Sequence, residues 1–530
     1  MAGVSTLNAT RTSFASIKTN GAKTLFFLII VLLTSCSVAQ PSIYQTPAAK
    51  DYCAEIVKSK NKPLAHYLAP FSQQMATQTG IYVLEEDAES MLTRAWLTEH
   101  AKTSIDIQYF IFSTDNIGLI ATDYLVKAAE RGVNVRMLVD DIMIEAKGSE
   151  LLVLAAHPNI EIKVYNPLAN IGKNIVQKLY NLTTRFHDFN QRMHNKTFTV
   201  DGQVTITGGR NIADEYFGYD HQYNFRDRDV LMLGGVVANV EQSFEQFWQS
   251  ELSVDVNKLA SRQRKTSIAA DFERLHQYAC NPENFVASIR QKISDLPKTF
   301  VEIERSGQLH WLNGVEYISD IPGKNTANKF LAGGGATTSR LLELVQQAKS
   351  SITIQTPYLV TTKDVRKVFK ALVERGVEIK ILTNSLASND NLEAFSGYQR
   401  DRKALLNTGV EIYEFKPDAA IRQKIMSQVL DKKLADSPIF GLHAKSMVID
   451  DEIAVIGTFN LDPRSIHLNT ESITVIPSIE VAKSVKQGML EEMQPENAWR
   501  ISKDFNPDSE VSAIKRLKVK LRRIVPKSIL

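Results

Sequence analysis

The stretch of sequence that decides the fold is His194-Asn195-Lys196-Thr197-Phe198-Thr199-Val200-Asp201. Its pattern, His-x-Lys-x-x-x-x-Asp, occurs a second time at His443-Ala444-Lys445-Ser446-Met447-Val448-Ile449-Asp450. In both copies a Gly-containing turn follows, and an Asn (Asn211 or Asn460) lies 17 residues after the His (211 − 194 and 460 − 443). Two copies with the same downstream spacing predict two equivalent half-sites, each with an imidazole, an ammonium and an amide. This combination suits a phosphodiester, whose negative charge it can compensate.

The two motifs belong to a longer internal repeat. Residues 101–108 match residues 348–355, and residues 130–133 match residues 374–377. The offsets between the paired blocks and motifs are 247, 244 and 249 residues (348 − 101, 374 − 130 and 443 − 194). A repeat of roughly this length is far too long for a solenoid. The sequence therefore predicts a duplicated domain.

Hydrophobic periodicity predicts the same order of elements in each repeat. Helix, strand, helix and strand are expected at residues 88–102, 104–111, 117–131 and 133–139, and again at 338–349, 351–357, 363–375 and 377–383. Helices that alternate with short strands favour βαβ units. The expected fold class is therefore α/β, with mostly parallel sheets flanked by helices. Within each motif the His and Lys lie two residues apart on a strand, so both side chains leave the same face.

Further segments support a resemblance to a known family. They are Gly208-Gly209-Arg210-Asn211, Arg226-Asp227-Arg228-Asp229-Val230, Ser319-Asp320-Ile321-Pro322-Gly323-Lys324 and Gln355-Thr356-Pro357-Tyr358. With the two motifs, about residues 80 to 495 resemble the phospholipase D superfamily. Within it, the chain is similar to the bacterial cardiolipin synthases, in the branch thought to use phosphatidylethanolamine as a co-substrate. The resemblance implies two tandem phospholipase D-like α/β domains that form a pseudo-dimer with one shared active site.

The resemblance also implies a division of roles between the two histidines. His194 would form a covalent phosphohistidine, and His443 would act first as the acid and then as the base. Spacing alone leaves the reverse assignment open. Lys196 and Lys445 would supply positive charge to the phosphoryl group. Because these lysines compensate its charge, we expect no metal and no cofactor.

Amide and carboxylate side chains complete the predicted site. Asn211 and Asn460 are expected to donate hydrogen bonds to the phosphoryl oxygens. Each His also needs a carboxylate that fixes its tautomer and stabilises the imidazolium. In the second repeat, Glu471 matches the family's position for this role. The first repeat has additional residues there, and we predict Asp229 as the counterpart, with Asp227 as the alternative.

The two acids that end the motifs are expected to have a structural role. Asp201 and Asp450 lie at the far ends of their strands from the His and Lys. We therefore predict that they are structural ion-pair partners and take no part in the chemistry. Arg210 occupies a position where many superfamily members have a small hydroxyl residue, and its role, structural or in headgroup recognition, stays open.

The N-terminus has the features of a bacterial lipoprotein signal peptide. Basic residues precede an apolar run at residues 25–33, which is shorter than the roughly 20 residues needed to span a bilayer. Leu33-Thr34-Ser35-Cys36 resembles a lipobox, so Cys36 is the predicted lipidation site; an ordinary cleaved signal is the alternative. This predicts a membrane-anchored lipoprotein of the bacterial cell envelope that faces the periplasm, on the inner or the outer membrane. Cys53 and Cys280 could pair or stay as buried thiols.

The C-terminus is strongly basic. The chain has a net charge of +3, but residues 513–530 hold seven Lys and Arg and no acid, which leaves −4 for the rest (3 − 7). Ile514, Leu517, Leu521 and Ile524 recur at helical spacing, so the tail is predicted to be a basic amphipathic helix on an anionic bilayer. A solvated tail is the alternative. Because the remainder is slightly acidic, we expect no nucleic-acid partner.

Together these features predict an envelope enzyme that acts on phospholipids. The predicted function is phosphatidyl transfer that gives cardiolipin from phosphatidylglycerol, with phosphatidylethanolamine as a candidate co-substrate. A phospholipase D-type hydrolase that forms phosphatidic acid is the alternative, and a nuclease is less favoured. The oligomeric state stays open. The predicted organisation is a signal peptide (1–36), a tether (37–80), domain 1 (81–255), a connector (256–335), domain 2 (336–495) and the basic tail (496–530).

Overall fold

A computed structural model describes residues 51–530 of the chain, with gaps. The gaps are 56–61, 144–148, 169–176, 178–179, 182–183, 260–266, 286–288, 294, 297–303, 306, 326–332 and 427–437. The predicted signal peptide, its Cys36 and much of the predicted tether lie outside the described residues. Of the helices that are described, none is both long and apolar enough to cross a bilayer.

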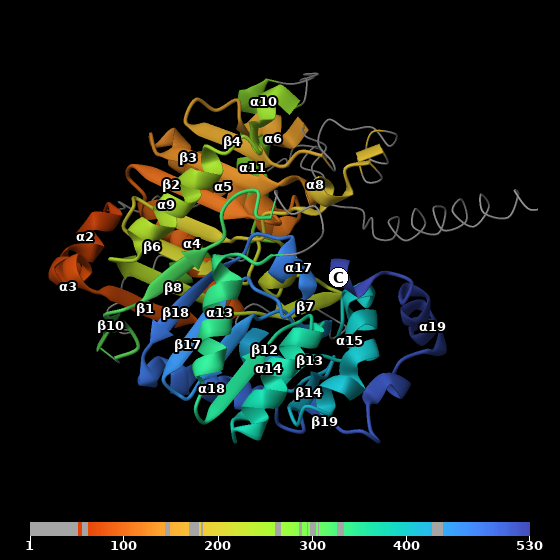
Figure 1. The fold of residues 1–530 in the computed structure, drawn as a ribbon. Helices are drawn as coiled ribbons and strands as arrows, with labels where there is room; N and C mark the ends of the chain where they lie inside the picture. Colours follow the sequence, from red (N-terminus) through yellow and green to blue (C-terminus); the bar gives the residue numbers. More distant parts are fainter. Residues whose placement is uncertain are drawn as a thin grey trace, which may run out of the picture. The chain divides into compact units, whose positions relative to one another are not determined.

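A mixed β-sheet forms the centre of each repeat (Figure 1). In the first repeat the described strands run in the order β10 (His310–Leu312), β1 (Thr79–Leu84), β8 (Asp229–Gly234), β6 (Val204–Gly208), β5 (Thr197–Val200), β2 (Ser104–Tyr109), β3 (Asn134–Asp140), β4 (Ile160–Tyr165) and β9 (Ser253–Asp255). In the second repeat the order is β11 (Glu316–Ser319), β18 (Ser472–Pro477), β17 (Ile453–Gly457), β16 (Ser446–Ile449), β12 (Ser351–Gln355), β13 (Glu378–Asn384), β14 (Glu411–Phe415) and β19 (Ala498–Ile501). A separate parallel pair joins β7 (Tyr223–Arg226) to β15 (Ile439–Leu442).

The predicted α/β fold class is confirmed, but the sheets are mixed, and the expectation that they are mostly parallel is wrong. Among the described strands of the two large sheets, β2, β3 and β4 are parallel neighbours, as are β12, β13 and β14, and the other neighbours are antiparallel. The parallel strands are those of the predicted βαβ units. Each motif strand instead forms an antiparallel hairpin, β5–β6 or β16–β17, which pairs with the other edge of β2 or β12. Helix and strand alternation therefore predicted only part of each sheet.

Helices cover both faces of each sheet. In the first repeat, α4 (Asp87–His100) and α5 (Asn116–Glu130) pack on one face and α9 (Val237–Trp248) on the other. In the second, α13 (Ala336–Gln347) and α14 (Lys363–Glu374) pack on one face and α18 (Ile479–Glu492) on the other. The other described helices are α2 (Leu64–Leu68), α3 (Ser72–Thr77), α6 (Ser149–Leu154), α8 (Phe186–Asn190), α10 (Val256–Leu259), α11 (Ile268–Cys280), α15 (Leu392–Leu406), α16 (Arg422–Met426), α17 (Pro463–His467) and α19 (Ala513–Arg522).

Local signals in the sequence set the ends of α5 and α14. Asp115 caps α5 by accepting a hydrogen bond from the Gly118 backbone, and Thr362 caps α14 in the same way. Gly132 and Gly376 follow the helices with φ of +93° and +92°, a conformation that favours glycine. The predicted order helix, strand, helix, strand is confirmed in both repeats, with ends within about two residues.

One apolar cluster contains residues from both repeats. Val230 and Met232 of β8 pack in it with Val448 of β16 and Ala454 of β17, and all four are buried. Helices α9 and α18 contribute to the same cluster. Burial of apolar side chains from both repeats in one core joins the two domains into a single folded unit, as expected for a pseudo-dimer.

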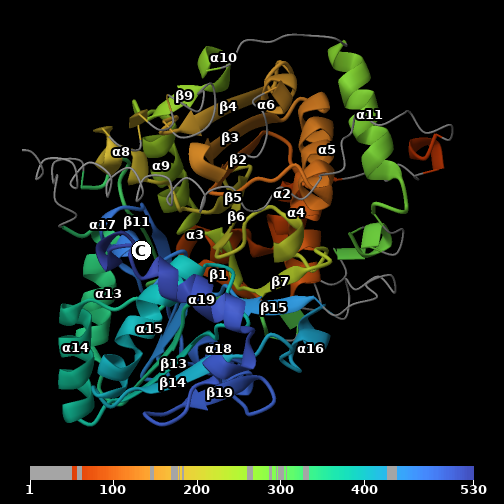
Figure 2. The same ribbon diagram turned by 90° about the vertical axis from the view of Figure 1, so that its right-hand side faces the viewer.

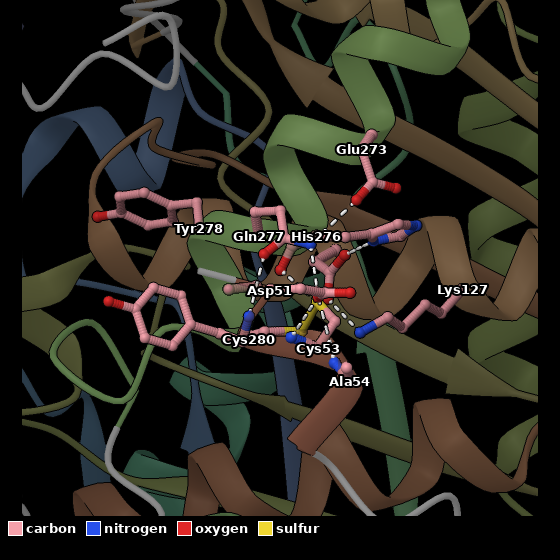
Figure 3. Close-up of a disulfide and its surroundings, with 12 residues drawn as sticks. Asp51, Cys53, Ala54, Lys127, Glu273, His276, Gln277, Tyr278 and Cys280 are labelled. Carbon is pink, nitrogen blue, oxygen red and sulfur yellow. Dashed lines mark hydrogen bonds and ion pairs between the residues drawn. A yellow bond between two sulfur atoms is a disulfide. The ribbon is translucent and has the colours of Figure 1, made fainter. Parts of the chain in front are cut away.

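The two cysteines within the described residues form a disulfide. Cys53 lies before the first repeat and Cys280 ends α11, and their Cα atoms are 5.1 Å apart (Figure 3). The bond closes a loop between positions 227 residues apart in the chain. It therefore ties the N-terminal segment to residues 256–335, which also supply β10 to the first sheet and β11 to the second.

The basic tail forms a helix that is docked on the protein. Helix α19 packs against α15 (Figure 2), with Val519 fully buried between them. Arg522 pairs with Glu393 of α15, at 2.6 Å. The chain then ends with Leu530 buried, and its backbone oxygen accepts a hydrogen bond from Arg464 of α17. The amphipathic helix is thus confirmed, and in this structure it is an integral part of the second repeat.

Candidate active site

Each motif enters the site through backbone hydrogen bonds to the other repeat. The His194 amide donates to the Thr470 carbonyl at 3.0 Å, and the His443 amide donates to the Arg226 carbonyl at 2.7 Å. Thr470 and Arg226 each lie one residue before a carboxylate, Glu471 or Asp227. The backbone therefore brings every motif histidine to an acid that the opposite repeat supplies.

The carboxylates hold the two histidines in a crossed arrangement. Nδ1 of His194 lies 2.8 Å from Glu471, and Nδ1 of His443 lies 2.6 Å from Asp227. An ionised carboxylate can only accept a hydrogen bond, so in the neutral imidazole Nδ1 carries the hydrogen and Nε2 keeps its lone pair. Both acids are fully buried. The arrangement thus orients both Nε2 atoms for reaction, as a His–carboxylate pair does in other enzymes.

Asp227 is the partner of His443, and the prediction of Asp229 is wrong. Asp229 instead accepts hydrogen bonds from Ser90 and Arg94 at 2.8 and 2.9 Å and lies 3.5 Å from Arg210. The physical reason is strand register. Gly208 pairs with Asp229 and the equivalent Gly457 pairs with Ile473, so Asp229 corresponds to an apolar position.

The repeat offsets contained the signal that selects Asp227. Asp227 and Glu471 are separated by 244 residues (471 − 227), within the range of 244 to 249 shown by the repeated blocks. The separation between Asp229 and Glu471 is 242 (471 − 229), outside that range. The glutamate in one repeat and the shorter aspartate in the other therefore occupy equivalent places.

The predicted lysines lie beside the motif histidines, and the predicted asparagines are buried. Lys196 and Lys445 are 1% and 4% exposed, and each ammonium donates to the carbonyl of its own motif His. Asn211 accepts a hydrogen bond from the Ile111 backbone at 3.1 Å. The side-chain oxygen of Asn460 is buried and has no hydrogen-bond partner within the described part of the chain. Two ammonium groups thus lie beside the histidines, and the buried Asn460 oxygen is left without a partner among the described residues.

Burial keeps the histidines neutral in the free site. Burial lowers the pKa of His194 to about 4. The positive charges of Lys196 and Lys445 act in the same direction, and the Glu471 carboxylate opposes them. Burial and the Lys445 charge lower the pKa of His443 to about 3. Although burial opposes it, the neighbouring His443 and Lys445 hold the pKa of Asp227 below its ordinary value. A neutral imidazole beside an ionised acid is the state that a nucleophile requires.

The lysines titrate near neutral pH. Burial and the mutual repulsion of the two charges lower the pKa of Lys196 to about 7, and burial lowers the pKa of Lys445 to about 8. Each group is charged below its pKa and loses the charge as the pH rises through it. A bound anion favours the charged form, so anion binding and proton uptake are linked.

Anion affinity should therefore fall with rising pH. Sulfate stays a dianion between pH 6 and pH 9. We expect its inhibition constant to rise by at least about tenfold over this range, because Lys196 and then Lys445 lose their protons. The measurement is competitive inhibition across this range. Lys196→Arg, which stays charged, should remove one of the two steps. A constant that does not vary with pH would contradict these assignments.

Asp201 and Asp450 have a structural role, but as acceptors for backbone amides. Asp201 accepts hydrogen bonds from the backbones of residues 102–104, and Asp450 does so from residues 349–351. Neither forms an ion pair with a side chain of the described residues. The predicted ion pairs are wrong for the described residues, because each acid instead accepts hydrogen bonds from three consecutive backbone N–H groups.

Sequence reasoning missed the residues that hold the carboxylates. Thr458 and Ser465 donate to the two oxygens of Glu471, at 2.5 and 2.8 Å. In the first repeat Arg210 is fully buried and donates to the Asp227 carbonyl at 2.9 Å and to Asp87 at 3.0 Å. Arg210 therefore supports the loop of Asp227 from the protein interior. Arg210 and Thr458 occupy equivalent positions in the two repeats, and this correspondence was the signal in the sequence that could have identified them.

Known proteins share this chain's repeats and fold. The family model described as "Cardiolipin synthase, PLD-like domain" matches residues 97–248 and again residues 341–493. Cardiolipin synthase C of Escherichia coli (strain K12) is 33% identical over 449 residues, which cover 83% of this chain and 90% of that protein. An uncharacterized protein of Helicobacter pylori is 29% identical over 477 residues, 90% of each chain. The crystal structure of phosphatidylserine synthase from Haemophilus influenzae Rd KW20 matches with a TM-score of 0.55 at 14% identity, covering 88% of this chain and 100% of that one, so the two share a fold.

Proposed function

The chain belongs to the phospholipase D superfamily, in the family described as cardiolipin synthase, PLD-like domain, and from this premise we propose that it is a phosphatidyltransferase that makes cardiolipin. The observation that supports the proposal is the pair of buried histidines, each held through Nδ1 by a carboxylate of the other repeat. This arrangement leaves two Nε2 atoms for one phosphodiester. Phosphatidylglycerol is the proposed substrate, with phosphatidylethanolamine as co-substrate.

The proposed reaction has two displacement steps at phosphorus. In the first, Nε2 of His194 bonds to phosphorus while the bond to the leaving oxygen breaks, and His443 gives that oxygen a proton. The anionic phosphodiester favours the protonated imidazole, so His443 gains this proton when substrate binds. In the second, His443 takes the proton of the acceptor hydroxyl, whose oxygen bonds to phosphorus and displaces His194. Lys196 and Lys445 compensate the phosphoryl charge throughout.

Burial of the site favours transfer over hydrolysis. His194 and His443 are 6% and 5% exposed. An acceptor alcohol bound there excludes water from the phosphohistidine. Water that reached the intermediate would give phosphatidic acid, the product of the alternative function, a phospholipase D-type hydrolase.

We further propose that the protein is a membrane-anchored lipoprotein of the bacterial cell envelope that faces the periplasm. The lipobox-like segment that ends at Cys36 supports this location. The disulfide between Cys53 and Cys280 also supports it, because disulfides persist in oxidising compartments. Mass spectrometry of the mature N-terminal peptide tests the anchor, since an unmodified Cys36 would contradict it.

Helix α19 is the proposed second contact with the membrane. An α-helix turns by about 100° per residue, so Ile514, Leu517 and Leu521 share one side and the buried Val519 lies on the opposite side. These three side chains are 68%, 56% and 51% exposed. Lys518 and Lys520 flank them and are exposed as well. Apolar side chains between basic ones suit the surface of an anionic bilayer.

Product analysis tests the proposed function. Purified protein given phosphatidylglycerol should form cardiolipin, and added phosphatidylethanolamine should raise the yield. Phosphatidic acid as the sole product would support the hydrolase and contradict the transferase. Cleavage of single-stranded DNA at a comparable rate would instead support a nuclease.

The same assay tests the membrane contact when it is run on anionic vesicles and on detergent micelles. The double variant Leu517→Ser/Leu521→Ser should lose about tenfold in activity on vesicles and little on micelles. The reason is that only the assay on vesicles depends on contact between α19 and a bilayer. Ile479→Ser is the matched control, since Ile479 is 49% exposed on α18. Equal losses on vesicles and micelles would contradict the proposed contact.

A further inference from the structure

An apolar cavity of about 340 Å³ adjoins the catalytic centre in the second repeat. Its lining residues include members of α13, α14 and the sheet that these helices cover, and Figure 1 shows how these elements are arranged. Its walls include Leu341, Val368, Met447 and Ile466, and it reaches Lys445. Lys445 and Met447 are two residues apart on one strand face, so the catalytic ammonium and the apolar wall share that face.

The first repeat has the same cavity in a nearly closed form. The block offsets pair Arg94 with Leu341 (247), Tyr124 with Val368 (244), Phe198 with Met447 (249) and Phe217 with Ile466 (249). All four first-repeat residues line a cavity of about 50 Å³ between α4 and α5. The two cavities are therefore equivalent places in a duplicated fold.

Larger side chains fill the first cavity. An aromatic ring stands at three of the four paired positions in the first repeat, where the second has Val368, Met447 and Ile466. Phe285, which follows α11 and is 1% exposed, also lines the first cavity. The lining of the second cavity includes no residue from the segment that contains Phe285. In the first repeat, side chains thus fill most of this cavity. In the second repeat the equivalent cavity is open beside Lys445.

We propose that the open cavity binds one acyl chain of the phospholipid whose phosphodiester lies at His194 and His443. The proposal rests on the proposed function for the identity of the ligand. A volume of about 340 Å³ falls within the roughly 300–1,000 Å³ usual for small-ligand pockets. An apolar cavity stays dry and takes apolar ligands. Because Lys445 is among the lining residues, an acyl chain in the cavity lies next to the lysine proposed to hold the phosphate.

Refilling the cavity tests the proposal through chain length. The variant Val368→Tyr/Met447→Phe introduces the residues of the first repeat. We expect kcat/KM for dioleoyl phosphatidylglycerol in mixed micelles to fall at least about tenfold, and that for the dihexanoyl lipid to change less than about twofold. Ile479→Ser, an exposed substitution on α18 outside the cavity lining, should change neither. Equal losses for both lipids in a protein of unchanged melting temperature would overturn the proposal.

Photo-crosslinking tests the site without turnover. The His194→Asn variant would be given phosphatidylglycerol that carries a diazirine on one acyl chain, and the labelled peptides would be identified by mass spectrometry. Labels on α13, α14 or β16, reduced by Val368→Tyr/Met447→Phe, are expected. Labels confined to other elements would overturn the cavity assignment. Absence of cardiolipin synthesis by the wild-type protein would instead contradict the proposed function, while the crosslinks would still report on the cavity.

Discussion

Replacing His443 by Asn should lower phosphatidyl transfer by about 10⁴-fold or more, and His194→Asn should do the same. The Asn amide can still meet the carboxylate of the opposite repeat, but it cannot take up a proton or form a bond to phosphorus. Both losses should be of similar size because both histidines act on one phosphodiester. The measurement is the initial rate of lipid product formation at saturating substrate, with circular dichroism as the control for folding. Retention of more than about 1% activity in either variant would contradict a shared site.

The two variants also separate the roles of the histidines. A short-chain phosphodiester with a p-nitrophenol leaving group needs no proton on departure. In His443→Asn, such a substrate should leave a covalent adduct on His194, because attack is still possible and the second step is not. Intact-protein mass spectrometry would show the added mass, and peptide mapping would place it. An adduct on His443 in the His194→Asn variant would show that the roles are reversed.

Asp227→Asn should lower kcat by about 10²–10⁴-fold. The amide retains the shape of the acid but no longer supplies the negative charge that stabilises the imidazolium of His443. Asp229→Asn should behave differently, because Asp229 is fully buried beside Arg94 and Arg210. Loss of its charge leaves these cations undercompensated and should cost about 3 kcal/mol of stability.

The variants Asp227→Asn and Asp229→Asn are matched controls for each other. Both variants change one carboxylate to an amide, two residues apart, where the loop that contains Asp227 leads into β8 at Asp229. Urea unfolding gives the free energies and steady-state kinetics give kcat. The expected outcome is a large kinetic loss with Asp227→Asn and a large stability loss with Asp229→Asn. A larger loss of kcat in Asp229→Asn than in Asp227→Asn would overturn the crossed arrangement.

The sequence predicted most of the fold because its signals are local. Caps at Asp115 and Thr362 and glycines at 132 and 376 are visible in the chain, and they mark the helices that follow β2 and β12. Strand direction across the sheet is not a local property. The motif hairpins join β2 and β12 on the edge opposite β3 and β13, and no short pattern in the sequence reports that choice.

For the site, the sequence predicted residues that the structure brings together, and it did not predict which of them contact each other. His194, Lys196, His443 and Lys445 follow from the repeated motif. The crossing of Glu471 to His194 and of Asp227 to His443 depends on how the two sheets face each other. The role of Arg210 likewise emerges only when its guanidinium is seen buried against Asp87 and the Asp227 backbone. The choice of Asp227 over Asp229, by contrast, was open to prediction, because only Asp227 is separated from Glu471 by an offset that the repeated blocks show.

The crossed carboxylates also constrain how the chain can change over time. Glu471 serves a histidine that lies 277 residues before it, and Asp227 serves one that lies 216 residues after it. A substitution of either acid is therefore expected to impair the histidine of the other repeat. Neither half can drift, be exchanged or be duplicated again on its own without disabling its neighbour. The two copies of the ancestral domain are inherited as one indivisible unit.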